Sequence, residues 1–445
     1  MGTKTSTFTF GTHAIDSSNE SIVFSYSLIH REETFSFEER LVIPGLSKNG
    51  NIALVQRVLE SLHLILGISY WKMFCPPAID TGGIALTKEQ ASFWNTVYTK
   101  GLGEFFYTNN IDFHDLVQFP VSKIDASGPI ALSTQDKSLV QVGGGKDSIV
   151  SAELLKAAHK DFTLVTIDAR DIHRRVALIV DKPLLEVGRE IDSKLYALNL
   201  RQEVYNGHIP VSAINAFVSL LLAVLGGFRF IITSNEESAN YPNVKYLGEE
   251  INHQWSKTLE FETLFQRYVS TYITPDVTYF SLLRPMGEIK IIELFVKLEQ
   301  YFTTISSWNN NFRRLGKVPS LRWCGTCPKC AFVFLLLSAF VPKDRLLTIF
   351  GINLYAHESL LPTFRELLGL TGAKPFECVG TAEECRFALY KASEAGQYNA
   401  DIVMQTLKGE LGDLWKTLPA LKEKLFLFSA DHRIPASFQS ILPNS

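Results

Sequence analysis

The stretch LVQVGGGKDSIVSAELLKAAH (139–159) decides the fold, because it joins a short apolar strand to a glycine loop and then to an amphipathic helix. A second apolar run, FTLVTI (162–167), follows closely. Farther along, an apolar helix expected over 213–225 leads into a buried strand, FRFIIT (228–233). Nearly continuous apolar strands that alternate with helices predict a parallel sheet covered by helices on both faces, which is a doubly wound α/β fold.

Ligands bind to such a sheet at the carboxyl ends of its strands. Three polar segments are expected at that edge: the glycine loop, Asp168 after the second strand, and Ser234-Asn235-Glu236 after the strand 228–233. Taken alone, each could be a turn or a helix cap. Their agreement favours a binding site at this edge.

The glycine loop consists of Gly143, Gly144, Gly145, Lys146, Asp147 and Ser148. Glycines let the backbone approach an anion closely, and the N–H groups at the start of the helix supply a partial positive field. Lys146 adds a positive charge and Ser148 a hydroxyl donor, while Asp147 caps the helix or holds Mg²⁺. The expected ligand is a phosphate chain.

The sequence changes in character on both sides of this region. Residues 1–125 mix strand-like and helical segments, and the chain beyond residue 302 is mostly helical. Strands are expected over 21–28, 35–37 and 41–43, and helices over 52–66 and 91–107. We therefore expect an N-terminal α+β domain (1–125) that faces the substrate, a domain that carries the glycine loop (126–305), and a helical C-terminal domain (306–445).

Composition excludes several classes of protein. Of the 445 residues, 46% are hydrophobic and 20% are charged, which is too apolar for a disordered chain. Lys and Arg number 43 against 46 Asp and Glu, and the formal net charge of −3 argues against a dedicated nucleic-acid binder. Six cysteines are too few for a disulfide scaffold and indicate a reducing compartment.

The N-terminal residues lack the apolar segment of a secretory signal. The most apolar stretch, 211–228, is interrupted by Asn215 and followed at once by Arg229, so we interpret it as a buried core helix leading into a strand. We expect a cytoplasmic protein without membrane insertion and without a nucleic-acid partner. The sequence does not indicate an oligomeric state.

Three of the cysteines, Cys324, Cys327 and Cys330, lie at two-residue spacing. Thiolates at this spacing chelate zinc, but a closed structural site needs a fourth ligand. The candidates for that ligand are Cys75, Cys378, Cys385 and the histidines. Alternatively, a cysteine at the start of the apolar helix expected over 331–341 has a lowered pKa and takes a proton from carbon. A merely structural cluster is the third interpretation.

Five cations surround the cysteines within 17 residues that contain neither Asp nor Glu: Arg313, Arg314, Lys317, Arg322 and Lys329. The simpler interpretation is a solvated face. The alternative is a set of clamps for the carboxylate or diphosphate of an anionic substrate. Lys374 is a further substrate-binding candidate.

The loop GGGKDS (143–148) resembles the S-G-G-x-D-S loop of the PP-loop ATP pyrophosphatase family, with Gly143 where that family usually has serine. The resemblance implies a HUP-like, nucleotide-binding domain over 126–305, whose loop holds the β,γ-phosphates of ATP while a substrate oxygen attacks the α-phosphate. It also implies that Asp168 contacts the nucleoside and that Ser234-Asn235-Glu236 forms a second nucleotide-side segment. The change at position 143 removes one hydroxyl contact.

Four motifs occur in a fixed order: GGGKDS (143–148), SNEESAN (234–240), WCGTCPKCAF (323–332) and KPFECVG (374–380). Together they resemble the bacterial UDP-N-acetylmuramoyl-L-alanyl-L-glutamate epimerases of peptidoglycan synthesis. The resemblance covers most of the chain. It implies an isomerase that converts the terminal L-glutamate of a small UDP-sugar dipeptide to D-glutamate with ATP and Mg²⁺.

The implied chemistry begins with activation, because a proton beside a free carboxylate is hard to remove. Adenylation removes the negative charge, a base takes the α-proton, reprotonation occurs on the other face, and hydrolysis releases AMP. Lys146 and an Mg²⁺ ion held by Asp147 would stabilise charge at the α-phosphate. The candidates for the proton carrier are Cys324, Cys327, Cys330, Lys329, Glu377, Cys378 and His253.

Two other functions stay open at this stage. An adenylating ligase or base-modifying enzyme of the PP-loop family would act on a tRNA or a deazapurine and would need ammonia or sulfur. A non-enzymatic nucleotide-sensing module with a structural zinc would bind ATP without releasing pyrophosphate.

Overall fold

The computed structural model describes residues 6–46, 51–123, 127–307, 322–372 and 374–443. Within them a single sheet contains, from one edge to the other, β11 (Thr278–Ser281), β8 (Phe228–Thr233), β5 (Gln135–Gln141), β6 (Phe162–Ile167), β7 (Leu184–Glu190), β3 (Glu33–Val42), β2 (Ser21–His30), β1 (Thr7–Asp16) and β4 (Ala78–Asp80). Two short strands, β9 (Val244–Tyr246) and β10 (Glu249–Ile251), pair separately.

Half of the large sheet is parallel, as the sequence predicts. β11, β8, β5, β6 and β7 pair with one another in parallel. The chain enters this half at β5, builds β6 and β7 on one side, and then returns to add β8 and β11 on the other. The strand order reverses between β5 and β8, and a crevice opens at such a reversal outside the carboxyl ends of the strands.

The other half is an antiparallel meander of β1, β2 and β3, with β4 parallel to β1 at the outer edge. β3 pairs antiparallel with β7 through Arg40, Leu41 and Val42, so the two halves share one ladder of hydrogen bonds. The strands of the expected first and second domains therefore belong to one sheet. The division at 125/126 stays a prediction.

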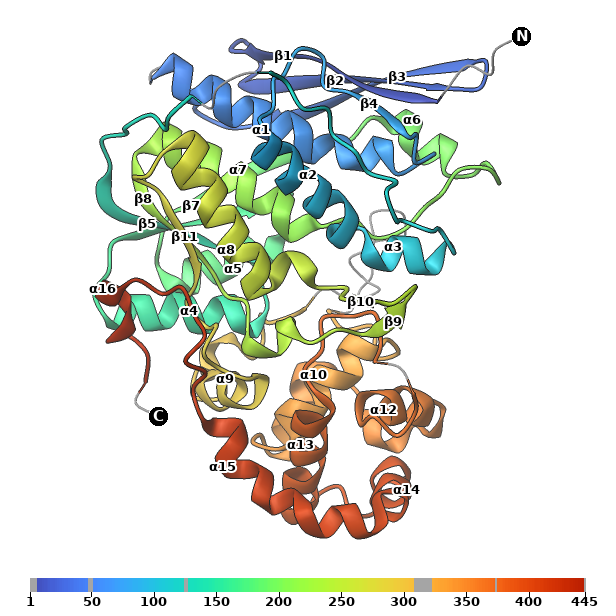
Figure 1. Cartoon of the computed structure of the whole chain (residues 1–445). Coiled ribbons are helices and arrows are strands. Elements are labelled where there is room, and N and C mark those ends of the chain that lie inside the picture. Colours follow the sequence, from blue (N-terminus) through green and yellow to red (C-terminus); the bar gives the residue numbers. More distant parts are fainter. Residues whose placement is uncertain (1–5, 47–50, 124–126, 308–321, 373, 444–445) are drawn as a thin grey trace.

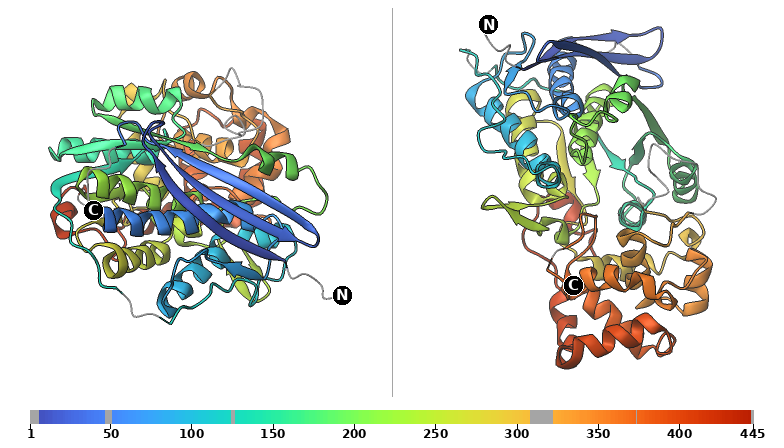
Figure 2. Two further views of the ribbon diagram at one scale, coloured as in Figure 1. Left: turned by 90° about the horizontal axis from the view of Figure 1, so that it is seen from above. Right: turned by 90° about the vertical axis from the view of Figure 1, so that its right-hand side faces the viewer.

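The helices up to the end of the sheet are α1 (Ile52–Trp71), α2 (Lys88–Gly101), α3 (Gly103–Thr108), α4 (Lys146–Ala157), α5 (Asp171–Val180), α6 (Ser193–Leu198), α7 (Val211–Gly226), α8 (Leu259–Tyr268) and α9 (Glu288–Phe295). The stretch expected as one helix over 91–107 is two, α2 and α3, separated at Leu102. Figures 1 and 2 show the N-terminal strands lying across α1, with α7 beneath it.

Alternate residues of the parallel strands enter two cores, because successive side chains of a strand point to opposite faces. Leu139 and Ile231 join α1 and α7 in one core, whereas Val140 and Ile232 join α4, α5 and α9 in the other. The sheet is thus covered on both faces, as expected of an α/β sheet with parallel strands.

Two apolar helices lie inside the protein. The expected core helix over 211–228 is α7, which leads into β8. Among the described residues α1 alone is long and apolar enough to cross a membrane, but 72% of its apolar window is buried inside the protein. It packs against α7 and the N-terminal strands as a core helix does.

The C-terminal part is helical, as predicted, and contains α10 (Pro328–Ser338), α11 (Lys343–Phe350), α12 (Leu361–Leu367), α13 (Ala382–Glu394), α14 (Ile402–Leu411), α15 (Leu421–Phe426) and α16 (Ala436–Gln439). α10 is buried among its neighbours, of which α13 and α12 contact it most. The end of the chain returns to the sheet, where Phe438 of α16 packs against Phe230 of β8 at 4.8 Å between ring centroids. This return joins the end of the chain to the face of the sheet that α4 and α9 cover.

Candidate active site

The glycine loop follows β5 and ends where α4 begins at Lys146. Gly144 has a φ of +77°, and a Cβ there would lie 2.9 Å from the side chain of Ile172, so both the backbone and the space require glycine. A Cβ at Gly143 would meet nothing. Gly145 is the N-cap of α4 and has no side chain to occupy the first N–H groups of the helix. The start of α4 therefore has no side-chain cap, and a helix N-terminus of this kind is favourable for anions.

Lys146 lies inside the protein, with only 1% of its surface exposed. Its ammonium pairs with the carboxylates of Asp147 and of Glu288, the first residue of α9. Burial opposes the charge of Lys146, but the two carboxylates outweigh it and raise the pKa of Lys146 above its ordinary value. Burial raises the pKa of Glu288 above its ordinary value, although Lys146 opposes this shift. Lys146, Asp147 and Glu288 form a charged cluster under the loop, named here the Lys146 cluster, in which Lys146 and Glu288 are buried and Asp147 is partly exposed.

Two hydroxyls that the sequence assigns to the nucleotide make bonds within the protein. Ser148 donates to the carbonyl oxygen of Gly145 at 3.1 Å. Ser234 donates to the hydroxyl of Ser151 on α4 at 2.7 Å, which fixes the end of β8 against that helix. A role of either hydroxyl in binding stays a prediction.

The other predicted segments lie at the same edge of the sheet. Asp168 follows β6 with a φ of +55°, and its carboxylate accepts a hydrogen bond from the backbone N–H of Arg189 at 2.8 Å. Asn235 and Glu236 follow β8 and are buried. The carbonyl oxygen of Asn235 accepts a hydrogen bond from Ser281 at the end of β11, at 2.6 Å. The structure therefore brings together the three segments that the sequence places at the carboxyl edge.

Arg284 connects the segments that follow β8 and β11 to the segment before α8. It is fully buried and forms an ion pair with Glu262 at 3.1 Å. It also donates to the carbonyl oxygen of Glu236 at 2.8 Å and to that of Lys257. Arg284 thus fixes the backbone on both sides of the buried site.

A thiol with charged partners lies next to these segments. The Lys257 ammonium donates to the sulfur of Cys378 at 3.1 Å. His253 pairs with the Glu104 carboxylate through Nδ1, and it lies near enough to Cys378 for each to shift the pKa of the other. The ring of His208 lies 4.4 Å from that of His253, and its Nδ1 lies 3.7 Å from the same Glu104 carboxylate. These five side chains come from four separate parts of the chain: Glu104 from α3, His208, the segment with His253 and Lys257, and the loop with Cys378.

The cations near Cys378 lower the pKa of its thiol, and Cys378 and Glu104 raise the pKa of His253. Burial alone would raise the pKa of Cys378, but Lys257 and His253 outweigh it and lower that pKa to about 6. Burial would lower the pKa of His253, but its hydrogen bonds to Cys378 and Glu104 raise it to about 9. At neutral pH the pair is therefore a thiolate and an imidazolium. Burial raises the pKa of the neighbouring Glu377, and the charge of Cys378 adds to that shift.

The loop that carries Cys378 is held from two sides. The buried ammonium of Lys329, on α10, donates to the carbonyl oxygen of Cys378. Glu384 caps α13 together with Thr381 and also accepts a hydrogen bond from the backbone N–H of Glu288 at 2.5 Å. A Cβ at Gly380 would lie 2.7 Å from the Glu384 carboxylate, so a larger residue would displace this contact. The loop with the thiol is thereby tied to the Lys146 cluster.

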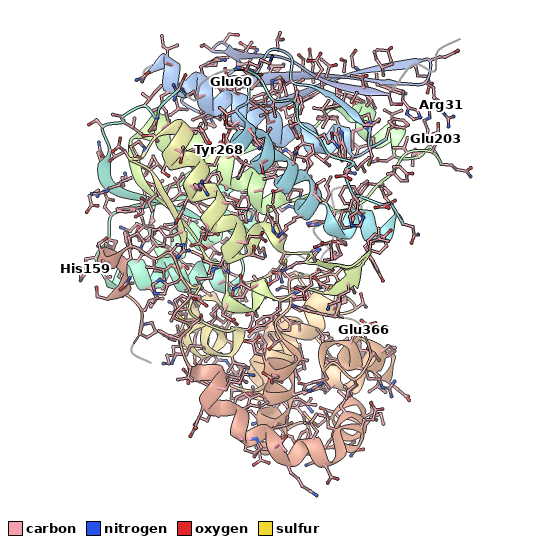
Figure 3. The ribbon with its side chains drawn as sticks, in the orientation of Figure 1. Arg31, Glu60, His159, Glu203, Tyr268 and Glu366 are labelled. Carbon is pink, nitrogen blue, oxygen red and sulfur yellow. The ribbon has the colours of Figure 1, made fainter. Side chains whose placement is uncertain are left out.

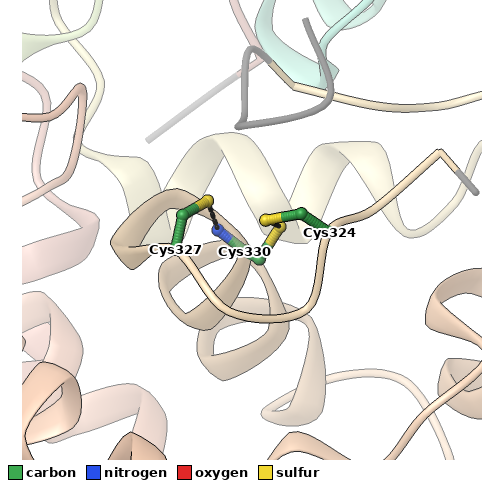
Figure 4. A group of neighbouring side chains, drawn as sticks. All are labelled: Cys324, Cys327 and Cys330. Carbon is green, nitrogen blue, oxygen red and sulfur yellow. Dashed lines mark hydrogen bonds between the residues drawn. The ribbon is translucent and has the colours of Figure 1, made fainter. Parts of the chain in front are cut away.

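The three clustered cysteines converge at the start of α10 (Figure 4). The sulfurs of Cys324 and Cys330 are 3.5 Å apart, and all three sulfurs lie within 4.8 Å of one another. Cys327 is the N-cap of α10 and accepts from the N–H of Cys330. No fourth cysteine, histidine or carboxylate of the described residues joins the group, so the distant ligand that the sequence called for is not found there.

The cationic candidates have separate positions. Arg313, Arg314 and Lys317 lie outside the described residues. The Arg322 guanidinium donates to the carbonyl oxygens of Phe302 and Ile305 at 3.3 and 3.4 Å. Arg322 therefore binds the backbone of the segment that follows α9. Lys329 reaches Cys378, and Lys374 lines a neighbouring cavity. The clamp interpretation of these cations stays a prediction.

A cavity of about 620 Å³ opens beside the loop 374–384. Figure 3 shows Glu366, one of its lining residues, in the C-terminal helical part, well separated from Glu60 and Tyr268 in the upper half. The lining contains four glutamates and two lysines, together with Gly287, which precedes Glu288. The cavity therefore lies between α12, α13 and α15 and extends to Gly287, next to Glu288 in the chain.

Sequence reasoning named His253, Cys378 and Glu377 as candidates but missed several of their partners. The missed residues are Glu104, His208, Lys257, Arg284 and Glu288. The segment LRPMGE (283–288) did carry a signal, because polar residues follow the apolar run at β11 just as they follow β8. Glu104 and Lys257 lie in helical segments whose pattern gives no such signal.

The chain is similar to proteins of known name. A relative from Xanthomonas oryzae pv. oryzae (strain MAFF 311018), named UDP-N-acetyl-alpha-D-muramoyl-L-alanyl-L-glutamate epimerase, is 37% identical over 97% of this chain and 95% of the relative. A relative of the same name from Micromonospora sp. (strain ATCC 39149 / NRRL 15099 / SCC 1413) is 36% identical over 98% of this chain and 97% of its own length. The family model described as the MurL N-terminal domain matches residues 1–282, and the one described as the MurL C-terminal domain matches 304–421. The chain belongs to the MurL family.

Proposed function

We propose that this protein converts the terminal L-glutamate of UDP-N-acetylmuramoyl-L-alanyl-L-glutamate to D-glutamate in the cytoplasm, for peptidoglycan precursor synthesis, and that it uses ATP to do so. The names and coverage of its relatives support the epimerisation. The observation that carries the use of ATP is the Lys146 cluster, which lies under a glycine loop at the reversal point of the sheet. The substrate is thus a small UDP-sugar dipeptide.

ATP solves a chemical problem in this reaction. The α-proton of a free carboxylate is hard to remove, because the carbanion would form beside an existing negative charge. Transfer of AMP to the carboxylate removes that charge and lets the carbonyl oxygen accept the electron pair. Hydrolysis after reprotonation releases AMP, so the cycle consumes one ATP and yields AMP and pyrophosphate.

The residues at the carboxyl edge suit this role. The loop Gly143-Gly144-Gly145 and the first N–H groups of α4 would hold the pyrophosphate. Asp147 offers the oxygen donors that Mg²⁺ prefers, and a bound Mg²⁺ would neutralise phosphate charge. Lys146, which now pairs with Asp147 and Glu288, would supply a further positive charge at the α-phosphate.

The proposal predicts the products of a single incubation. With ATP, Mg²⁺ and the L-glutamyl substrate in deuterated water, we expect AMP, pyrophosphate and D-glutamyl product that carries deuterium at Cα. Asp147→Asn is expected to lose AMP formation by about 10²-fold or more, because it removes a proposed carboxylate ligand of the Mg²⁺ that would neutralise phosphate charge. Asp171→Asn, an exposed change at the start of α5, is the matched control and is expected to keep activity.

Other outcomes point to the rival functions. Pyrophosphate without D-glutamate or deuterium would contradict epimerisation and favour an adenylating ligase. ATP binding without turnover by folded protein would favour a nucleotide-sensing module.

We also propose that Cys324, Cys327 and Cys330 hold one zinc ion. Three sulfurs within 4.8 Å of one another suit a tetrahedral ion with a fourth position left for a non-protein ligand. The ion would fix the start of α10, from which Lys329 reaches the loop with Cys378.

Metal analysis of protein purified under reducing conditions tests the zinc proposal. We expect about one zinc per chain in the wild type and in Cys75→Ala, whose cysteine lies outside the cluster. Cys330→Ser is expected to lose most of the metal. Wild-type protein without zinc, or a Cys330→Ser variant that retains it, contradicts the proposal.

A further inference from the structure

We propose that the sulfur of Cys378 is the base that takes the Cα proton of the activated glutamyl residue, and that Lys257 and the His253–Glu104 pair are positioning residues that keep it a thiolate. This inference rests on the proposed function, because it concerns the step that follows activation. It assigns the proton transfer to one of the several candidates that the sequence leaves open.

The geometry around Cys378 is that of an activated thiol. The Lys257 ammonium lies 3.1 Å from its sulfur, and His253 lies near enough to act on its pKa. The Glu104 carboxylate hydrogen-bonds to Nδ1 of His253 and so fixes the orientation of the imidazole ring. A thiolate in a half-buried position needs such charge compensation, and two cations supply it here.

The charged and titratable groups near Cys378 come from the segment 253–257, from α10 and from the loop of Cys378 itself. They are Lys257, His253, Lys329, Glu377 and Lys374. Three of them are lysines, and only Glu377 carries a negative charge. Glu377 is itself shifted toward the neutral acid. The surroundings therefore favour the thiolate over the thiol.

Around the other two cysteines outside the cluster, burial outweighs the nearby cations, which are Lys72 at Cys75 and Lys374 at Cys385. Cys75 donates its thiol proton to the carbonyl oxygen of Lys72 at 3.4 Å, and burial raises its pKa to about 12. Cys385 is fully buried in α13, and burial raises its pKa as well. Both behave as buried apolar side chains. Cys378 differs from them by its charged partners.

The thiol also lies close to the place where activation would occur. The ammonium groups of Lys257 and Lys329 are near enough to both Asp147 and Cys378 to lower the pKa of each. Arg284 fixes the backbone of Lys257 and of Glu236, which follows β8. A carboxyl group activated beside Asp147 would therefore lie near Cys378.

The proposed step balances in protons and electrons. The Cα–H bond breaks as the S–H bond forms, and the C–H electron pair moves into the Cα–carbonyl bond with the negative charge on the carbonyl oxygen. A water molecule gives a proton to the opposite face of the planar carbon, which forms the D centre and leaves hydroxide. The thiol then loses its proton to solvent, so that the sulfur is again a thiolate.

Cys378→Ala separates this step from activation. In deuterated water we expect incorporation of deuterium at Cα to fall by about 10²–10⁴-fold, the range for loss of a general base. Exchange of labelled pyrophosphate into ATP, which depends on substrate, is expected to stay within about threefold of wild type because it precedes proton transfer. Intact exchange also shows that the variant is folded.

His253→Gln tests the positioning role through the pH profile. In the wild type, deuterium incorporation is expected to rise as the pH passes about 6, where Cys378 loses its proton. Without the imidazolium the thiolate is less stable, so this rise is expected to move upward by about one pH unit. His357→Gln, at an exposed histidine in the C-terminal part, is the control and is expected to leave the profile unchanged.

Three results would overturn the inference. One is deuterium incorporation by Cys378→Ala at a rate near wild type. Another is the joint loss of pyrophosphate exchange and deuterium incorporation, which would assign Cys378 to activation or to folding. The third is a His253→Gln profile that does not move. A wild-type protein that shows no pyrophosphate exchange contradicts the proposed use of ATP instead, so the two failures are distinguishable.

Discussion

Lys146→Met is expected to reduce substrate-dependent AMP formation by about 10³-fold or more and to destabilise the fold by about 3–5 kcal/mol. The ammonium of Lys146 lies between the carboxylates of Asp147 and Glu288, in a position that is almost fully buried. Methionine fills a similar volume but leaves the two carboxylates facing each other without compensation. Glu288 would then take up a proton, and the positive charge proposed for the α-phosphate would be missing.

Urea unfolding and AMP formation measure the two effects separately. In Lys146→Met/Glu288→Gln the buried negative charge is removed, so part of the stability is expected to return while AMP formation stays low. Lys156→Met makes the same change in the last turn of α4 and is the control for helix effects. Lys146→Met with more than about a tenth of wild-type activity would contradict the proposed role.

Arg284→Met is expected to cost about 3–5 kcal/mol of stability and to impair both activation and proton transfer. The substitution leaves the Glu262 carboxylate buried and unpaired, since Arg284 is its ion-pair partner at 3.1 Å. It also removes the donor that holds the carbonyl oxygens of Glu236 and Lys257. The backbone at Glu236 and at Lys257 would shift, and the Lys257 ammonium would no longer be held against the sulfur of Cys378.

The loss should appear as a lower urea midpoint together with reduced pyrophosphate exchange and reduced deuterium incorporation. Arg267→Met, an exposed change on the same helix as Glu262, is expected to alter neither by more than experimental scatter. Should Arg284→Met unfold at the wild-type urea concentration, the ion pair with Glu262 would not have the structural role assigned to it here.

Sequence reasoning identified the parallel half of the sheet because its features are local. The run 139–159 has an apolar strand, a glycine loop and a helix in direct succession, and each element follows from its own residues. β6 and β8 are apolar throughout, since both of their faces are covered. The placement of the three polar segments at one edge then follows from the topology of parallel strands.

Other elements were not predicted because their patterns are weaker. β1 contains several threonines, a glycine and a histidine, and β7 and β11 are short or carry charged residues. The structure shows that one β3–β7 ladder joins the meander to the parallel strands. The sequence around β3 does not predict its pairing with β7, because the two strands are remote in sequence and meet only in the tertiary fold.

The partners of Cys378 were missed for the same reason. Glu104 and His253 are separated by 149 residues, and Lys257 and Cys378 by 121. A motif identifies residues at fixed spacing, whereas these contacts depend on how α3 and the C-terminal loop meet. Sequence reasoning could therefore name the thiol as a candidate but not the cations that distinguish it from the other cysteines.

The order in which these residues leave the ribosome follows from their positions. Glu104, His253 and Lys257 are all synthesised before the segment 374–384. This segment carries the thiol of Cys378 and the Glu384 carboxylate, which accepts a hydrogen bond from the backbone N–H of Glu288. The sheet and the glycine loop can thus fold while translation continues, since N-terminal units fold first during synthesis. The reactive sulfur reaches its cations only when the helical part docks, so a prematurely terminated product would carry the glycine loop without the thiol.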